Sequence, residues 1–150
     1  MITVDYTIYK GQLSVKKQDG KRWIFFFFFR KYLVLQPEEF VRQLVICYLL
    51  EEQNYNRNRI AIEKKLEVNG MTKRCDILVF QKDMQPWLLV ECKAPGVALN
   101  EATFRQVALY NMPLHVQYLM VTNGHTTYCC RMDYEKNDFE FLDEIPAFES

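Results

Sequence analysis

The chain has 150 residues, and its 19 Lys or Arg side chains balance 19 Asp or Glu side chains, so its formal net charge at pH 7 is zero. This balance gives no overall signature of a nucleic-acid, membrane or acidic-substrate partner. A hydrophobic content of 49% is enough for one core, and we expect a single domain over residues 1–150. The longest apolar run, Trp23 to Phe29, is far too short to span a bilayer, which predicts no membrane partner.

The charges are unevenly distributed along the chain. Residues 1–31 contain seven Lys or Arg against two acids, whereas the segment from Arg131 onward contains two basic residues against seven acids. Two interpretations of the basic segment remain open: a surface that meets phosphates, or an ordinary solvated surface.

The cysteines indicate the compartment. There are five, an odd number, without CxxC spacing and mostly inside apolar runs. This pattern is typical of buried thiols in a reducing environment rather than of a disulfide framework or a zinc site. We therefore expect a soluble, cytoplasmic protein.

The first predicted elements are short strands over residues 2–9 and 12–17, followed by a turn at 18–21, QDGK. The phenylalanine run at 25–29 predicts a strand or a buried connector. A helix is predicted from Pro37 to Gln53, because Pro37 suits a first turn, Glu38 and Glu39 complement the positive end of a helix, and an apolar stripe follows.

Three strands are predicted next, over residues 60–68, 71–80 and 86–93, with the hairpin signal Asn69-Gly70 between the first two. A second helix is predicted over 100–111, capped by Asn100. The remaining predicted strands are 116–122, 126–132 and 139–142. This order predicts an α/β sandwich with a mixed sheet.

The hairpin fixes a register that can be read from the sequence. A two-residue loop at Asn69-Gly70 pairs Val68 with Met71, and a second turn that pairs Phe80 with Trp87 continues the pattern. Two rows of charges are then expected on one face: Glu63, Asp76 and Glu91, and beside them Lys65, Arg74 and Lys93. The opposite face is expected to be the core, with Lys64 and Lys73 as exceptions toward the strand ends. Its apolar members are Ile62, Leu66, Val68, Cys75, Ile77, Val79, Leu88, Val90 and Cys92.

Two interpretations of these rows remain open on spacing alone. One is a salt-bridge ladder on a solvated sheet, since opposed like charges destabilise a sheet unless they are neutralised. The other is a Mg²⁺ site in which Asp76, Glu91 and the backbone carbonyl of Cys92 are oxygen ligands, with Lys93 beside a bound water. In the second interpretation Glu63 is a further candidate ligand.

Several short motifs carry a resemblance to a known family. Asp76 followed by Glu91-Cys92-Lys93, each on its own strand, resembles the PD-(D/E)xK nuclease motif, and Gln106 and Tyr110 on the second helix match the QxxxY element of its RecB-like branch. Together with ECKAP at 91–95 and VTNG at 121–124, they make residues 20–148 similar to stand-alone relatives of the N-terminal nuclease domain of type I restriction enzyme R subunits.

The resemblance implies a restriction-endonuclease-like core, a mixed central sheet of an antiparallel meander plus added strands, flanked by helices. It also implies Mg²⁺-dependent hydrolysis of DNA phosphodiesters in restriction or repair, with Mn²⁺ as a substitute. Asp76 and Glu91 would be metal ligands and Lys93 the catalytic lysine. Gln106 would position the lysine or the DNA, and Glu39, or else Glu38, would complete the metal site.

The resemblance also implies DNA as the partner, within a homodimer or a larger restriction or repair complex. Two departures qualify it: the segment IFFFFFRK lacks the aspartate that the family tends to carry there, and there is no GxxxxGK[ST] loop for ATP-driven translocation. The alternative function is a catalytically silent module that binds DNA or another subunit.

Overall fold

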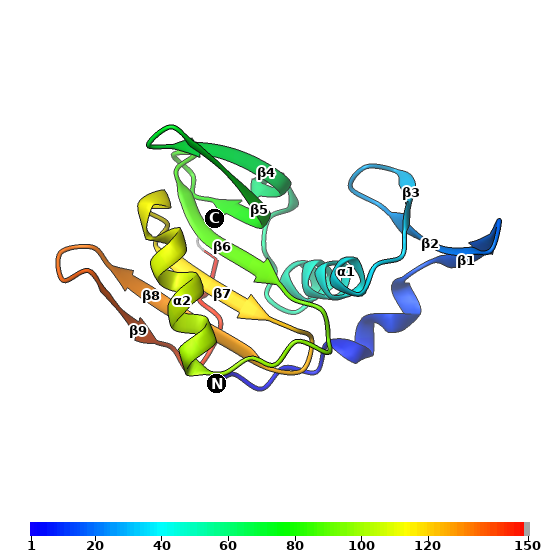
Figure 1. Ribbon diagram of the computed structural model, residues 1–150. Coiled ribbons are helices and arrows are strands. Elements are labelled where there is room, and N and C mark those ends of the chain that lie inside the picture. Colours follow the sequence, from blue (N-terminus) through cyan, green and yellow to red (C-terminus); the bar gives the residue numbers. More distant parts are fainter. Residues whose placement is uncertain (149–150) are drawn as a thin grey trace.

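A six-stranded mixed β-sheet forms the centre of the molecule in the computed structural model, which describes residues 1–148 (Figure 1). Its strands lie in sequence order, and neighbours are antiparallel except for the parallel pair β6 and β7. They are β4 (Ile60–Val68), β5 (Met71–Phe80), β6 (Pro86–Cys92), β7 (Tyr118–Thr122), β8 (Thr127–Asp133) and β9 (Asp138–Phe141). The predicted fold, a meander with added strands in a mixed sheet, is confirmed.

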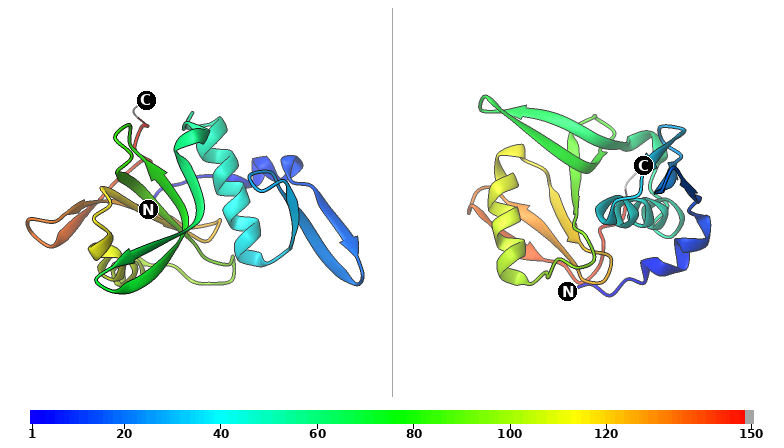
Figure 2. Two further views of the ribbon diagram at one scale, coloured as in Figure 1. Left: turned by 90° about the horizontal axis from the view of Figure 1, so that it is seen from above. Right: turned by 45° about the vertical axis from the view of Figure 1, so that its right-hand side comes forward.

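Helices α1 (Pro37–Glu51) and α2 (Glu101–Asn111) lie on opposite faces of this sheet (Figure 2, right). Pro37 occupies the first turn of α1 as predicted, and Asn100 caps α2 by accepting the backbone N–H of Thr103. Each helix has its own core, because alternate residues of β6 point to opposite faces: Leu88 and Val90 pack toward α1, and Leu89 packs toward α2. The sheet is therefore buried on both faces.

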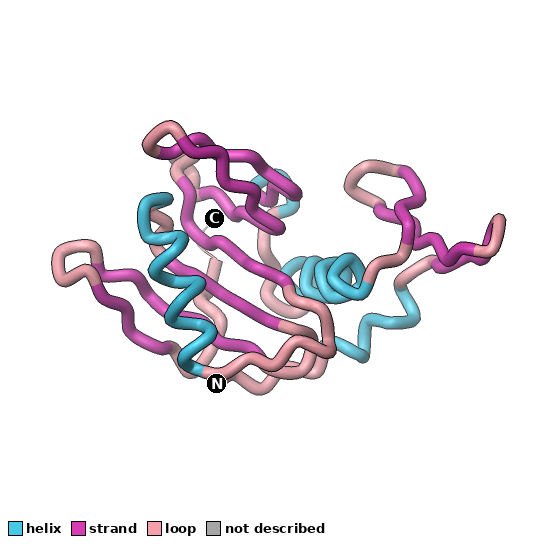
Figure 3. The backbone as a smooth tube through the Cα atoms, in the orientation of Figure 1, coloured by secondary structure: helices cyan, strands magenta, loops and turns pink. Residues whose placement is uncertain are grey.

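The amino-terminal segment differs in part from the prediction (Figure 3). Residues 2–9 do not form a strand; Asp5 caps a 3-10 helix, η1 (Tyr6–Gln12), and accepts the backbone N–H of Thr7. A separate antiparallel sheet follows, formed by β1 (Val15–Gln18), β2 (Lys21–Phe26) and β3 (Lys31–Val34). The turn at 18–21 is confirmed, and the phenylalanine run divides between β2 and the next turn. Two short 3-10 helices complete the chain, η2 (Arg57–Arg59) and η3 (Met112–Leu114).

The predicted register holds over most of the meander. Val68 pairs with Met71, Lys65 with Arg74, and Ile77 with Val90. At the far end of β5 the prediction is wrong, since Phe80 pairs with Pro86 rather than Trp87, and a bulge at Val79 and Phe80 absorbs the difference.

The predicted single core face is also wrong. Glu63 has a φ of 54°, a left-handed conformation that interrupts the alternation of β4, so Ile62 packs toward α1 and Leu66 toward α2. Strand β5 changes face at the same level: Cys75 packs toward α2, whereas Ile77 packs toward α1. The meander therefore twists across the middle of the molecule and contributes to both cores.

All five cysteines are buried free thiols, as predicted. Within residues 1–148, neither α1 nor α2 has the length and apolar character required to cross a membrane.

Candidate functional site

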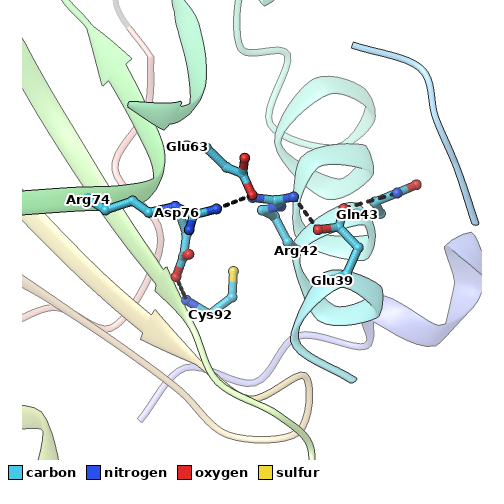
Figure 4. Close-up of polar contacts among 7 residues, drawn as sticks. All are labelled: Glu39, Arg42, Gln43, Glu63, Arg74, Asp76 and Cys92. Atoms are coloured by element: carbon cyan, nitrogen blue, oxygen red, sulfur yellow. Dashed lines mark hydrogen bonds and ion pairs between the residues drawn. The ribbon is translucent and has the colours of Figure 1, made fainter. Parts of the chain in front are cut away.

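Asp76 lies where the ladder between β5 and β6 ends. The last regular pair in this direction is Ile77 with Val90, and beyond it Asp76 Oδ2 accepts a hydrogen bond from the backbone N–H of Cys92 at 2.9 Å (Figure 4). The carboxylate thus replaces a backbone acceptor at the strand end. This bond fixes Asp76 directly beside the Glu91-Cys92-Lys93 segment, so the two halves of the predicted motif do meet.

An ion-pair network lies next to Asp76 and joins α1 to the meander (Figure 4). Arg42 on α1 is only 4% exposed and contacts two carboxylates, pairing with Glu39 one turn before it and with Glu63 Oε1 at 2.9 Å. Glu63 Oε1 also pairs with Arg74 Nη2 at 2.5 Å. Burial alone would raise the pKa of Glu63, but Arg42 and then Arg74 lower it below its usual value.

Arg42 has no counterpart among the predicted site residues. Glu38 lies four residues before Arg42, a spacing at which helix side chains can pair, but the structure pairs Arg42 with Glu39 and Glu63. The i, i+3 spacing of Glu39 and Arg42 could have predicted their ion pair from the sequence. The contact with Glu63 could not be predicted in this way, because it depends on the tertiary packing of α1. Glu39 also accepts a bond from Gln43 Nε2 at 3.2 Å, so both of its oxygens are engaged.

Glu91 lies on the other face of the sheet from this network. Its Oε1 accepts a hydrogen bond from Asn111 Nδ2 of α2 at 2.9 Å, and its Oε2 lies 3.8 Å from Lys93 Nζ. Asn111 is 3% exposed, and its amide also donates to the backbone carbonyl of Val107, so it holds the Glu91 carboxylate against α2. Asn111 directly follows Tyr110 of the QxxxY match in the sequence, but the match gave it no role at the site.

The two predicted charge rows are therefore not formed as expected. The ladder pairs neither Glu63 with Asp76 nor Asp76 with Glu91, because Glu63 is out of the strand conformation and β5 and β6 separate beyond Ile77. In the basic row only Lys65 and Arg74 are opposed, since β6 ends at Cys92.

The QxxxY residues lie on the outer side of α2. Gln106 is exposed, and within residues 1–148 its side chain makes no hydrogen bond to another residue. Tyr110 is 61% exposed, and Lys73 contacts both its ring, at 4.0 Å from Nζ to the centroid, and its backbone carbonyl. These contacts fasten the β4–β5 hairpin to α2.

A hollow of about 350 Å³ opens in front of Asp76. It is lined by Val34, Gln36, Glu38, Glu39, Arg42, Glu63, Arg74 and Asp76. A larger hollow, of about 820 Å³, lies at the other end of the sheet beside Trp87 and Phe148 and contains none of the predicted site residues. Of the predicted site residues, Asp76, Glu39 and Glu63 line the smaller hollow, whereas Glu91 and Lys93 do not.

Comparison with known proteins identifies the family. Residues 37–146 match the model of the family described as the type I restriction enzyme R protein N terminus. The chain belongs to this family. No curated protein matches the chain.

A solved structure shares the fold of this R-protein N-terminal family member. It is a fragment assigned to the HsdR subunit of a type I restriction enzyme from Vibrio vulnificus YJ016, with 21% sequence identity and a TM-score of 0.50. The alignment covers 75% of the present chain and 24% of that one, so the present chain spans about a quarter of its length.

The donor atoms suit a hard cation such as Mg²⁺, which takes oxygen ligands and needs only one or two protein carboxylates. Asp76 retains Oδ1 for this purpose, and Glu38 lines the same hollow. Within residues 1–148, however, no three His, Cys, Asp or Glu side chains are arranged together as a metal centre, because Glu91 faces α2 and Glu39 and Glu63 are bound to arginine. These residues fit an ion that is bound by Asp76 and takes water for its remaining ligands, rather than an ion whose ligands all come from the protein.

Proposed function

We propose that this protein is a Mg²⁺-dependent nuclease that hydrolyses DNA phosphodiester bonds, as a restriction-related R-protein N-terminal domain. The observation that carries the proposal is the hydrogen bond of 2.9 Å from the Cys92 amide to Asp76. It joins the acid of one strand to the Glu-x-Lys segment of the next, in a chain of the matching family. DNA and a restriction complex are the partners proposed with it.

Each residue has a proposed part in the reaction. Asp76 would hold the ion together with the backbone carbonyl of Cys92. Glu91 would act as a further ligand only by exchanging its hydrogen bond with Asn111 for the ion. A bound Mg²⁺ supplies charge stabilisation to the scissile phosphate and lowers the pKa of water. Lys93 is half-buried beside Glu91 and offsets the negative charge that develops on the phosphate. Gln106, exposed on α2, would contact the DNA backbone.

The nuclease test compares the full chain with Asp76→Asn and Lys93→Met on plasmid and linear DNA in Mg²⁺, Mn²⁺ or EDTA. We expect the cleavage rate to fall by about 10² to 10³ for each variant, the range seen when one charge-stabilising group is removed. Lys82→Met, an exposed lysine beside the other hollow, is the matched control and retains full activity. Equal activity in all four proteins would assign the cleavage to a contaminant.

A second candidate function, a catalytically silent module that binds DNA or another subunit, is favoured by the state of the acids. Glu91 is hydrogen-bonded to Asn111, and Glu39 and Glu63 form ion pairs with Arg42. A silent module that binds DNA or another subunit needs no free acidic cluster. DNA binding that weakens with salt, without cleavage in either metal, would favour this function.

A further inference from the structure

The amino-terminal sheet has an unusual distribution of charge. Between Ser14 and Val34 there are six Lys or Arg side chains and one acid, Asp19. Within the described residues 1–148, none of these six cations has a carboxylate oxygen within 4.0 Å. Lys17 and Arg22 are even directly opposed in the ladder, a like-charge pair that lowers the stability of a hairpin. The repulsion among these cations lowers the stability of the fold, and a polyanionic partner would neutralise their charge.

The two faces of this sheet have different surroundings. Ile24 and Phe26 are fully buried on the inner face, where the Arg42 guanidinium lies 5.2 Å from the Phe26 ring. This face packs against the body of the molecule. The β1–β2 hairpin projects beyond it, away from the large sheet (Figures 1 and 2).

The outer face combines aromatic rings with lysines. Trp23 and Phe25 alternate with the inner residues of β2, and the register places Lys16 beside Trp23 and Tyr32 beside Phe25. Tyr32 is 39% exposed, and Lys16 Nζ lies 3.9 Å from its ring centroid. Aromatic side chains interleaved with cations are the surface on which unpaired bases stack while their phosphates are neutralised.

This face also leads into the candidate site. Val34 is paired with Trp23 on the outer face, and the same Val34 lines the hollow that contains Asp76. A strand lying along Trp23 therefore reaches the hollow through Val34. The whole sheet precedes residues 37–146, so it lies outside the part of the chain that the family model matches.

We propose that the outer face of β1, β2 and β3 binds a single strand of nucleic acid and delivers its backbone to the Asp76 hollow. Lys16 and Lys21 contact phosphates on this face, and Lys17 adds charge at the hairpin end. Trp23 provides the stacking surface. Delivery of the strand to the Asp76 hollow rests on the proposed nuclease function. Binding of the strand to the sheet can be measured without cleavage.

The first test removes two charges from the hairpin. Lys17→Gln with Lys21→Gln is compared with Lys82→Gln with Lys136→Gln, which makes the same change of net charge at exposed positions elsewhere. Binding of a fluorescein-labelled 20-nucleotide single strand is measured by anisotropy in EDTA over a range of salt concentrations. Each phosphate contact to a single strand contributes about 0.7 to the slope of log K against log salt, so losing the contact of Lys21 lowers the slope by about 0.7 and weakens binding about 5-fold at 0.1 M salt, and losing the charge of Lys17 adds to this effect.

Several outcomes would overturn the proposal. The first two are an equal loss of affinity in both double variants and no loss of affinity in the hairpin variant. The others are no binding of the single strand by the original chain and tighter binding to a duplex of the same sequence. Urea unfolding distinguishes a loss of binding from misfolding. The unfolding free energy of the hairpin variant should be at least that of the original chain, because Lys17 no longer repels Arg22. Binding is measured in EDTA, which prevents metal-dependent cleavage, so the result does not depend on nuclease activity. If the chain binds the single strand but does not cut DNA in Mg²⁺ or Mn²⁺, the proposed nuclease function is contradicted and this inference is not.

A second readout reports stacking directly. The chain has two tryptophans, and Trp87 is 8% exposed within an aromatic cluster with Tyr55, Tyr118 and Phe148. Trp87→Phe keeps an aromatic ring in the cluster and leaves Trp23 as the sole tryptophan. Titration with oligo(dT) should quench its fluorescence, and unchanged fluorescence at saturating oligonucleotide would contradict the stacking role.

Discussion

Substituting Arg42 with methionine tests whether the buried ion pairs between α1 and the meander stabilise the fold. Arg42 is 4% exposed and contacts Glu39 and Glu63. Methionine keeps much of the apolar length of the side chain, so the change removes mainly the charge and its hydrogen bonds. Glu39, whose side chain is 11% exposed, then loses its cationic partner, while Glu63 keeps only the exposed Arg74.

The expected cost follows from these contacts. A hydrogen bond between charged groups contributes about 1.5–3 kcal/mol, and removing one partner of a buried pair costs about 3–5 kcal/mol because a charge is left uncompensated. We expect the Arg42→Met variant to lose about 3–5 kcal/mol of unfolding free energy at pH 7. The matched control is Arg74→Met, whose side chain is 61% exposed; its loss should be within about 1 kcal/mol, because Glu63 keeps Arg42.

The assay is urea unfolding followed by circular dichroism at several pH values. The folded-state pKa of Glu63 lies below its ordinary value of 4.5, so its contribution is present above that pH and is lost as the pH falls through the folded-state pKa. The difference between the original chain and Arg42→Met should therefore narrow below about pH 4.5. A loss under about 1 kcal/mol at pH 7, or a difference that widens on acidification, would refute the reasoning.

Three further predictions concern the cores and thiols. Leu89→Ala, at a fully buried position facing α2, should cost about 2–5 kcal/mol in urea unfolding, and a smaller loss would mean that α2 closes the cavity. Tyr6→Phe removes a buried hydroxyl 3.0 Å from Thr127 Oγ1 and should cost about 1–2 kcal/mol; no change would show that water replaces the bond. Burial raises the pKa of Cys47 and of Cys75 from 9.0 to about 11, so iodoacetamide at pH 8 should alkylate them at least about 100-fold more slowly in the native protein than in urea, as mass spectrometry would show. Equal rates would contradict their burial.

The sequence predicts the parts of the fold that local signals determine. Asn69-Gly70 fixes the hairpin, and β4 and β5 have the predicted bounds and the predicted pairing at every position except Glu63 with Asp76. Asn100 caps α2 as expected. These elements depend on turn chemistry, capping and alternation, all of which are properties of neighbouring residues.

The side-chain arrangement of the site depends on tertiary contacts that no local pattern contains. A glutamate inside an apparently regular strand gives no warning of a positive φ, yet this angle at Glu63 moves half of β4 to the other core. In the same way, Asn111 approaches Glu91 only because α2 packs on that face of the sheet. The motif identified which residues meet at the strand ends, but the direction in which each carboxylate points required the packed helices.

The backbone of Glu63 has a consequence for how the protein would change over generations. A left-handed conformation costs a non-glycine residue about 1–2 kcal/mol, so Gly or Asn at this position would relieve the backbone. The acid remains favourable only while its ion pairs with Arg42 and Arg74 are useful. Lineages that lose the need for those pairs should drift toward Gly or Asn here. The residue found at this position in descendants would thus record whether selection still acts on the charged surface or only on the fold.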